Sequence, residues 1–189
     1  MHYGLKPFGN GFRQIYEVSY AIKAGANNKL KIAGIKSKTV MNKNFTPLSF
    51  SSIGKTTGNL VFAGYGISYP DSNYDDYAKI DVKDKIVLIM LGQPEGASGN
   101  KFNRFDNPRY KATIARDKGA RAVIFFNPMS DSKRDILPQL RNDRTSSKAG
   151  LPLIQIKSQL AEEIFKSKKK DFRTIIDNIN KEVTPNSFE

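Results

Sequence analysis

KIVLIML at residues 85–91 and RAVIFF at residues 121–126 are two strongly apolar runs of strand length. Apolar residues on both faces are typical of strands in a parallel sheet that is covered on both sides. The segment between them has Asn107 as a possible helix cap, Pro108 suited to the first turn, and Gly119 as a stop signal. Together these elements predict a β-α-β unit, with a crossover that is expected to be right-handed.

Segments on either side of this unit extend it. Residues 59–66 and 151–156 are apolar runs that predict further buried strands. Ser158 is expected to cap a helix after the last strand, and Asp171 a second helix whose apolar residues recur at helical spacing. The tail from Thr184 is expected to be frayed.

The N-terminal part is less regular. Residues 14–24 and 29–35 alternate apolar and polar residues, which predicts two strands with one solvated face. Residues 45–58 are rich in Ser, Thr and Gly and are expected to be irregular or edge structure, and residues 68–84 can hold at most a short helical turn. The expected fold is an α+β domain: a curved or barrel-like β-sheet that contains the β-α-β unit and is flanked by two or three helices.

The composition excludes several kinds of active site. The chain has 189 residues, with 31 Lys and Arg against 18 Asp and Glu, and its formal charge is +13. It has no cysteine and one histidine, His2. Disulfides, cysteine nucleophiles and thiolate metal sites are therefore excluded, and a Ser-His-Asp triad or a zinc hydrolase centre would lack its histidines. We predict no catalytic residue and no cofactor in this chain.

The sequence also bears on membranes and compartment. No apolar run reaches the roughly 20 residues that a bilayer-spanning helix needs. No basic segment leads into an apolar run at the N-terminus, so no signal peptide is visible. The composition by itself leaves the compartment unknown.

The acidic residues gather in one part of this basic chain. Asp71, Asp75 and Asp76 lie close together in the sequence, and oxygen ligands at such spacing could hold calcium. The segment lacks the central glycine and closing glutamate of an EF-hand loop, and turn formation with helix capping is the other interpretation. These three residues are a calcium candidate, and we predict no other metal site.

Two glycine motifs share some residues with nucleotide-binding loops. IGKTTGN at residues 53–59 contains Gly-Lys-Thr but lacks the earlier glycine that a phosphate-binding loop needs. The Gly-Tyr-Gly triplet at residues 64–66 follows a predicted strand, but Pro70 blocks the helix that a dinucleotide fingerprint requires. We expect ordinary tight turns at both places.

The positive charge suggests an anionic partner. However, Lys and Arg are scattered from Lys6 to Lys181, whereas nucleic-acid binders usually concentrate them on one element. No recognition-helix or RNP-type strand motif is present. We therefore do not favour specific nucleic-acid binding. A basic module that binds anions or nucleic acid is kept as the alternative to the function predicted below.

Two long polar loops, residues 92–107 and 127–150, are the candidate contact surfaces, because exposed loops on a rigid sheet often carry recognition. Exposed apolar residues are expected to mark where another domain docks. For each charged residue in these loops, the other interpretation is that it only keeps the surface soluble and makes no specific contact. The candidate binding residues are Arg104, Phe105, Arg134 and Arg141.

The segment NLVFAGYGISYPDSNYDDYAKIDVKDKIVLIMLG at residues 59–92 resembles protease-associated (PA) domains. In that family a Gly-Tyr-Gly-like turn is followed by an acidic, aromatic stretch, matched by residues 74–77, and then by a D-V-K-x-K-I-V-L strand, matched by residues 81–88. Residues 110–120 are similar to the family's K-x-x-x-A-x-x-x-G-A helix exit. LPLIQI at residues 151–156 is similar to the strand before its closing helix.

The version that this chain resembles is the PA domain inserted in secreted di-zinc aminopeptidases of metallopeptidase clan MH. Residues 4–12 are similar to the stretch that enters the first strand of those enzymes. The resemblance implies a single domain over residues 1–189, with a PA core at about 45–168. Residues 1–44 and 169–189 would be flanks leading to and from a peptidase catalytic domain.

The resemblance also implies a role. The zinc ligands of those enzymes lie in the catalytic domain, outside the insert, so this chain would be non-catalytic and without a metal of its own, while the parent enzyme would use zinc. The implied partners are the parent's catalytic domain and a peptide or protein substrate, whose access to the active site the insert would modulate. The implied location is secreted, periplasmic or at the cell surface.

Overall fold

The computed structural model describes Gly4, Gly11 and residues 21–97, 99, 101–128, 135–141 and 148–189. Within these residues, a five-stranded sheet has the order β1-β7-β6-β5-β2, and a two-stranded sheet joins β3 to β4. The larger sheet is parallel except for β1, which pairs antiparallel with β7. The expected α+β class is confirmed. The strands are β1 (Phe45–Pro47), β2 (Leu60–Phe62), β3 (Ser68–Tyr69), β4 (Tyr74–Asp75), β5 (Ile86–Met90), β6 (Ala122–Phe126) and β7 (Leu153–Ile156).

The predicted β-α-β unit is confirmed: β5 leads into α1 (Pro108–Asp117), and α1 leads into β6. The side chain of Asn107 caps α1 by accepting a hydrogen bond from the N–H of Arg109 at 2.9 Å. Gly119 follows the helix with φ of +91°, a left-handed conformation that costs glycine little. Short 3-10 turns, η1 (Pro70–Ser72) and η2 (Asn103–Asp106), interrupt the connections.

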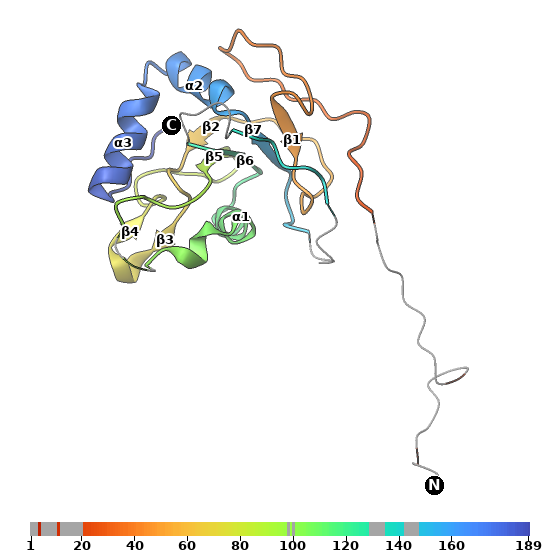
Figure 1. The fold of residues 1–189 in the computed structure, drawn as a ribbon, viewed down its shortest axis with the longest axis horizontal. Coiled ribbons are helices and arrows are strands. Elements are labelled where there is room, and N and C mark those ends of the chain that lie inside the picture. The colour runs from red at the N-terminus through yellow and green to blue at the C-terminus, as the bar shows by residue number, and fades with distance from the viewer. Residues whose placement is uncertain are drawn as a thin grey trace.

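The sheet is covered on both faces, as the apolar strands predict. Leu88 and Met90 point to the face that packs against α2 (Ser158–Ser167) and α3 (Phe172–Glu182). Val87 and Ile89 point the other way, into a second core with α1. Figure 1 shows α2 and α3 on one side of the sheet and α1 on the other. The two apolar layers explain why these strands do not alternate with polar residues.

The two C-terminal helices begin in different ways. Asp171 caps α3 as predicted, by accepting a hydrogen bond from the N–H of Thr174 at 2.7 Å. The expected cap at Ser158 is wrong, because Ser158 is the first residue of α2 and makes no such bond. Instead, Oδ2 of Asp135 accepts the hydrogen bond from the N–H of Ser158 at 2.7 Å. A residue far away in sequence therefore caps α2.

The predicted N-terminal strands are not found. Residues 29–35 form no strand, and residues 21–24 form none either, while residues 14–20 lie outside the described part. The segment runs beside α2, where the backbone N–H groups of Lys36 and Ser37 both donate to Glu163 at 3.1 Å. The alternating apolar residues are partly buried against the core that contains α2 and α3, and they pair with no neighbouring strand.

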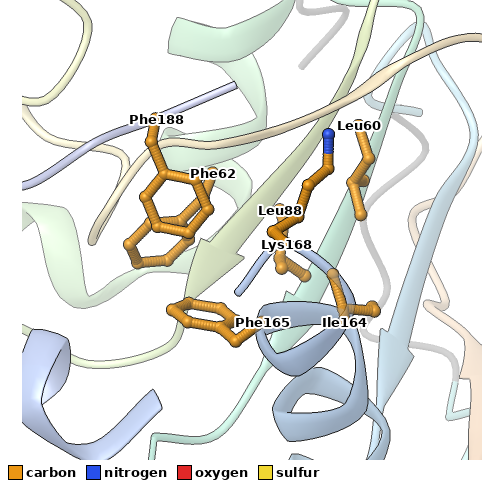
Figure 2. Close-up of a pocket in the computed structure, with 7 residues that line it drawn as sticks. All are labelled: Leu60, Phe62, Leu88, Ile164, Phe165, Lys168 and Phe188. Atoms are coloured by element: carbon orange, nitrogen blue, oxygen red, sulfur yellow. The ribbon is translucent and has the colours of Figure 1, made fainter. Parts of the chain in front are cut away.

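The C-terminal tail is not frayed as expected. Phe188 pairs with Phe62 of the edge strand β2, through backbone N–H to O distances of 2.8 and 3.0 Å. Figure 2 shows the ring of Phe188 beside that of Phe62, with Phe165 of α2 nearby, and Glu189 forms an ion pair with Lys85 at 2.8 Å. The tail is ordered because it satisfies backbone groups that the edge strand would otherwise leave unpaired.

Candidate functional site

Buried polar side chains gather where β2 and β5 end. Tyr65 lies in the Gly-Tyr-Gly turn after β2, Asp76 follows β4, and Lys111 lies in the first turn of α1, and each is at most 1% exposed. Gly64 has φ of +46°, and a Cβ there would lie 2.3 Å from Oδ1 of Asp76. The tight turn expected from the glycines is confirmed, and its glycine is required by close contact with a carboxylate.

Lys111 connects α1 to the carboxyl end of β5. Its Nζ donates hydrogen bonds to the carbonyl oxygens of Met90 at 2.9 Å and Gly92 at 2.5 Å. The same atom lies 5.2 Å from the centre of the Tyr65 ring, within the range of a cation–π contact. Lys111 therefore holds the point at which the loop of residues 92–107 leaves the sheet.

Asp76 holds the Gly-Tyr-Gly turn. Its Oδ2 accepts a hydrogen bond from the N–H of Ile67 at 2.9 Å. Its Oδ1 makes no hydrogen bond within the described residues. Asp76 and Lys111 form no direct ion pair, so their interaction is a longer-range attraction between two buried charges.

Burial shifts both groups toward neutral pH. Loss of water raises the pKa of Asp76 to about 7, opposed by the N–H of Ile67 and by the charge of Lys111. Loss of water lowers the pKa of Lys111 to about 7, opposed by the charge of Asp76. Such a matched acid and base could exchange protons with a ligand only if a ligand could reach them. Both are buried, so the arrangement serves to position the turn and the loop.

Asn180 of α3 completes this arrangement. Its Oδ1 accepts a hydrogen bond from the hydroxyl of Tyr65 at 2.7 Å, and its backbone oxygen accepts one from the N–H of Gly96 at 3.0 Å. Sequence reasoning missed the cluster. One available signal was Lys111, which falls on the same helix face as the sheet-packing residues Ala112 and Ala115.

The calcium candidates do not converge. Asp71 is exposed and Asp76 points into the core. Asp75 accepts a hydrogen bond from the N–H of Tyr77 at 3.0 Å and lies 3.9 Å from the Nζ of Lys118. The described residues contain no group of three or more potential ligands that could hold a metal ion.

The candidate binding residues also lie apart. Arg104 is exposed and stacks on the rings of Tyr69, at 4.3 Å, and Phe105, at 4.8 Å. Phe105 is fully buried, which corrects its placement on an exposed loop surface: its ring packs against other aromatic residues of the core. Arg141 is exposed, and Arg134 lies outside the described residues. Of the three described candidates, Arg104 and Phe105 are in contact with each other.

Exposed apolar side chains are few in the described part of the chain. Ile53 is fully exposed, Ile136 is 72% exposed, and Val40 and Tyr110 are half-exposed. Whether they mark a docking surface stays a prediction. No helix in the ranges that the structure describes has both the length and the apolar character to cross a bilayer.

Comparison with known proteins gives a family and two structural relatives. The family model described as PA domain matches residues 56–164. One similar structure is an aminopeptidase from Aneurinibacillus sp. strain AM-1, with 20% identity, a TM-score of 0.46, and coverage of 67% of this chain and 25% of that chain. Another is BSAP, a zinc aminopeptidase from Bacillus subtilis, with 26% identity, a TM-score of 0.42, and coverage of 65% and 25%. This chain therefore spans about a quarter of the length of each of these two structures. A search of the curated proteins found no match.

Proposed function

This chain belongs to the PA domain family, and on that premise we propose that it is the non-catalytic module of a larger peptidase. The observation that carries the proposal is the family match over residues 56–164. The composition supports it, because one histidine and no cysteine are too few to build a zinc hydrolase centre within this chain. The module would modulate the access of peptide substrates to the active site, or contact peptides directly.

The proposed parent is a zinc aminopeptidase-like metallopeptidase. The proposal rests on the order and spacing of the motifs in residues 59–92 and 110–156. The zinc, the substrate and the location of such a parent belong to the proposal, since this chain spans only a quarter of the two aminopeptidase structures. In this proposal, residues 1–44 and 169–189 are flanks that lead to and from the catalytic domain.

A fixed loop beside the Gly-Tyr-Gly turn suits a contact role. Lys111 and Asn180 hold the start of the loop of residues 92–107, and Arg104 projects from it with its guanidinium stacked on Tyr69. A guanidinium held by aromatic stacking loses less freedom on binding than a free one. Arg104 and the exposed Tyr110 are therefore our first candidates for contact with the catalytic domain or with substrate.

The test compares the longer peptidase with a form that lacks residues 45–168. We expect removal of the module to change the ratio of kcat/KM for a long peptide to that for a dipeptide. Equal ratios in the two forms would contradict the proposed role. Zinc content and melting temperature of both forms control for damage to the catalytic domain.

A second measurement tests the absence of catalysis in the chain itself. The purified chain with added zinc is expected to show no turnover of aminoacyl-nitroanilides. Clear turnover that a chelator abolishes would overturn the non-catalytic assignment.

A further inference from the structure

The strand β2 forms one edge of the larger sheet. Asn59 and Ala63, the residues on either side of it, both hydrogen-bond through their backbones to β5. Because alternate residues of a parallel strand bond to the same neighbour, the backbone groups of Leu60 and Phe62 face away from the sheet. An edge of this kind is a template on which another extended segment can pair.

The C-terminal tail, residues 184–189, uses one position of this edge. The backbone N–H and oxygen of Phe62 pair with those of Phe188 at 2.8 and 3.0 Å, in antiparallel orientation. Within the described residues, no hydrogen bond joins the backbone of Leu60 to a segment outside the sheet. The tail is therefore held by one pair of backbone hydrogen bonds and by the side chains of Phe188 and Glu189.

An apolar slot between β2 and α2 receives the ring of Phe188. The centre of this ring lies 5.2 Å from that of Phe62 and 5.3 Å from that of Phe165. The Nζ of Lys170 lies 5.2 Å from it, within the range of a cation–π contact. The gap left beside the ring measures about 10 Å³, room for one water molecule at most, and Leu60 lines it too (Figure 2). The slot thus fits one aromatic side chain closely.

The positions that follow the aromatic residue also have defined surroundings. The carboxylate of Glu189 pairs with Nζ of Lys85 at 2.8 Å and accepts a hydrogen bond from the N–H of Asp81 at 3.4 Å. In the same antiparallel register, the residue two places after the aromatic one lies opposite Leu60, with its side chain on the face of the slot. The edge therefore suits an aromatic, an acidic and an apolar residue in that order.

We propose that the outer edge of β2 binds an extended peptide segment of this order, and that the tail is a built-in competitor for the site. The peptide adds a strand to the sheet, its aromatic ring replaces that of Phe188, and its backbone also pairs with Leu60. The inference rests on the proposed function in that it takes peptide contact to be the module's task. Binding would then release the tail, which belongs to the flank that leads to the catalytic domain in that proposal.

The observations favour a separate peptide over the tail of a second copy. A second tail offers the same ring and carboxylate as the tail already in place, but it lacks the millimolar effective concentration that a short tether gives. A peptide that continues past the acidic residue gains the pair with Leu60, which the tail does not make. Exchange of tails between two copies is therefore an outcome that the experiment must be able to reveal.

The experiment measures binding to the full chain by fluorescence anisotropy, with the labelled peptide Asn-Ser-Phe-Glu-Val-Thr as the probe. Phe188→Ala weakens the competitor and leaves β2 unchanged. We expect the probe to bind this variant at least about tenfold more tightly than the parent chain, because the fraction of chains with a free edge rises. The matched control is Asn186→Ala, which changes an exposed tail residue and should have no effect. Equal binding to the parent and to Phe188→Ala, or binding to neither, would overturn the proposal.

Changes in the peptide test how the edge recognises it. Serine in place of phenylalanine should weaken binding at least about tenfold, and a peptide that stops after glutamate should bind about threefold more weakly, because it loses the pair with Leu60. Lys85→Glu, added to Phe188→Ala, should reverse the preference between the glutamate peptide and one with lysine at that position. This preference is a ratio within one chain, so it holds even if the variant is less stable. If the serine peptide binds as tightly as the probe, the slot is not the site.

The remaining outcomes are distinct. If light scattering shows a dimer of the parent chain that Phe188→Ala abolishes, the edge serves a second copy and the inference fails. If the peptide binds as expected but removal of the module leaves the peptidase ratios unchanged, the edge site stands and the proposed access role fails. Changed ratios with no peptide binding mean the reverse.

Discussion

Asp76 and Asp135 are two buried carboxylates with nearly the same local geometry. Each uses Oδ2 to accept a backbone N–H, from Ile67 at 2.9 Å and from Ser158 at 2.7 Å. In each, Oδ1 has no hydrogen-bond partner within the described residues. Asp76 lies in the core near the buried amine of Lys111, whereas Asp135 lines a groove at the N-terminal ends of α2 and α3. The two carboxylates therefore share a local geometry but differ in their charged neighbours.

Asp76 and Asp135 also differ in how much of the surrounding structure they hold in place. Asp76 belongs to a cluster, with Tyr65, Lys111 and Asn180, that fastens a turn, a loop and two helices. Asp135 fastens one helix terminus, the start of α2. Removing a partner should therefore cost more stability at Asp76 than at Asp135.

The largest expected effect is that of Lys111→Met. The change leaves Asp76 without its cationic neighbour and the carbonyl oxygens of Met90 and Gly92 without their donor. We expect the free energy of unfolding to fall by about 3–5 kcal/mol. Urea denaturation measures it, with the exposed Lys79→Met as the control, expected to change it by less than about 0.5 kcal/mol. A loss below about 1 kcal/mol at Lys111 would mean that the buried pair is not structural.

The pH dependence of stability is the next largest effect. The pKa of Asp76 is raised from 3.8 to about 7 in the folded state, so the folded chain binds more protons between these values and stability falls as pH rises through them. The pKa of Lys111 is lowered from 10.5 to about 7, so the folded chain binds fewer protons there and stability rises as pH rises from about 7 to 10.5. The contribution of this pair is therefore smallest near pH 7.

The measurement compares the parent chain with the double variant Asp76→Asn, Lys111→Met by urea denaturation at about pH 5, 7 and 9. We expect the variant to gain on the parent by about 2 kcal/mol between pH 5 and pH 7, and to lose that gain again toward pH 9. A difference that is constant over this range would show that the two groups do not titrate there.

The central fold could be predicted from sequence because its signals are local. The apolar runs at residues 85–91 and 121–126 have strand length, and Pro108 and Gly119 mark the ends of the helix between them. Residues 29–35 were mispredicted because alternation shows that one face is buried, not what covers it, and here the segment packs on the core without pairing with a strand. The tail is ordered by a contact between Phe188 and Phe62, which no local pattern reveals.

The polar clusters were harder to predict than the fold. Asp76 was visible as part of an acidic stretch, but only the tertiary structure shows that it turns inward toward Lys111. Asp135 lies in a polar loop without periodicity, and its role appears only when the loop meets the start of α2.

The smallest expected effect concerns the stability role of Asp135 and distinguishes it from Asp76. Asp135→Ala removes the cap of α2 and should lower the free energy of unfolding by about 1 kcal/mol, because the N–H of Ser158 loses its acceptor. Asp135→Asn keeps an acceptor and should cost less than about 0.5 kcal/mol. Urea denaturation of the two variants side by side measures the difference. If Asp135→Asn proves as damaging as Lys111→Met, then Asp135 is a second structural carboxylate, and the contrast between Asp76 and Asp135 does not hold.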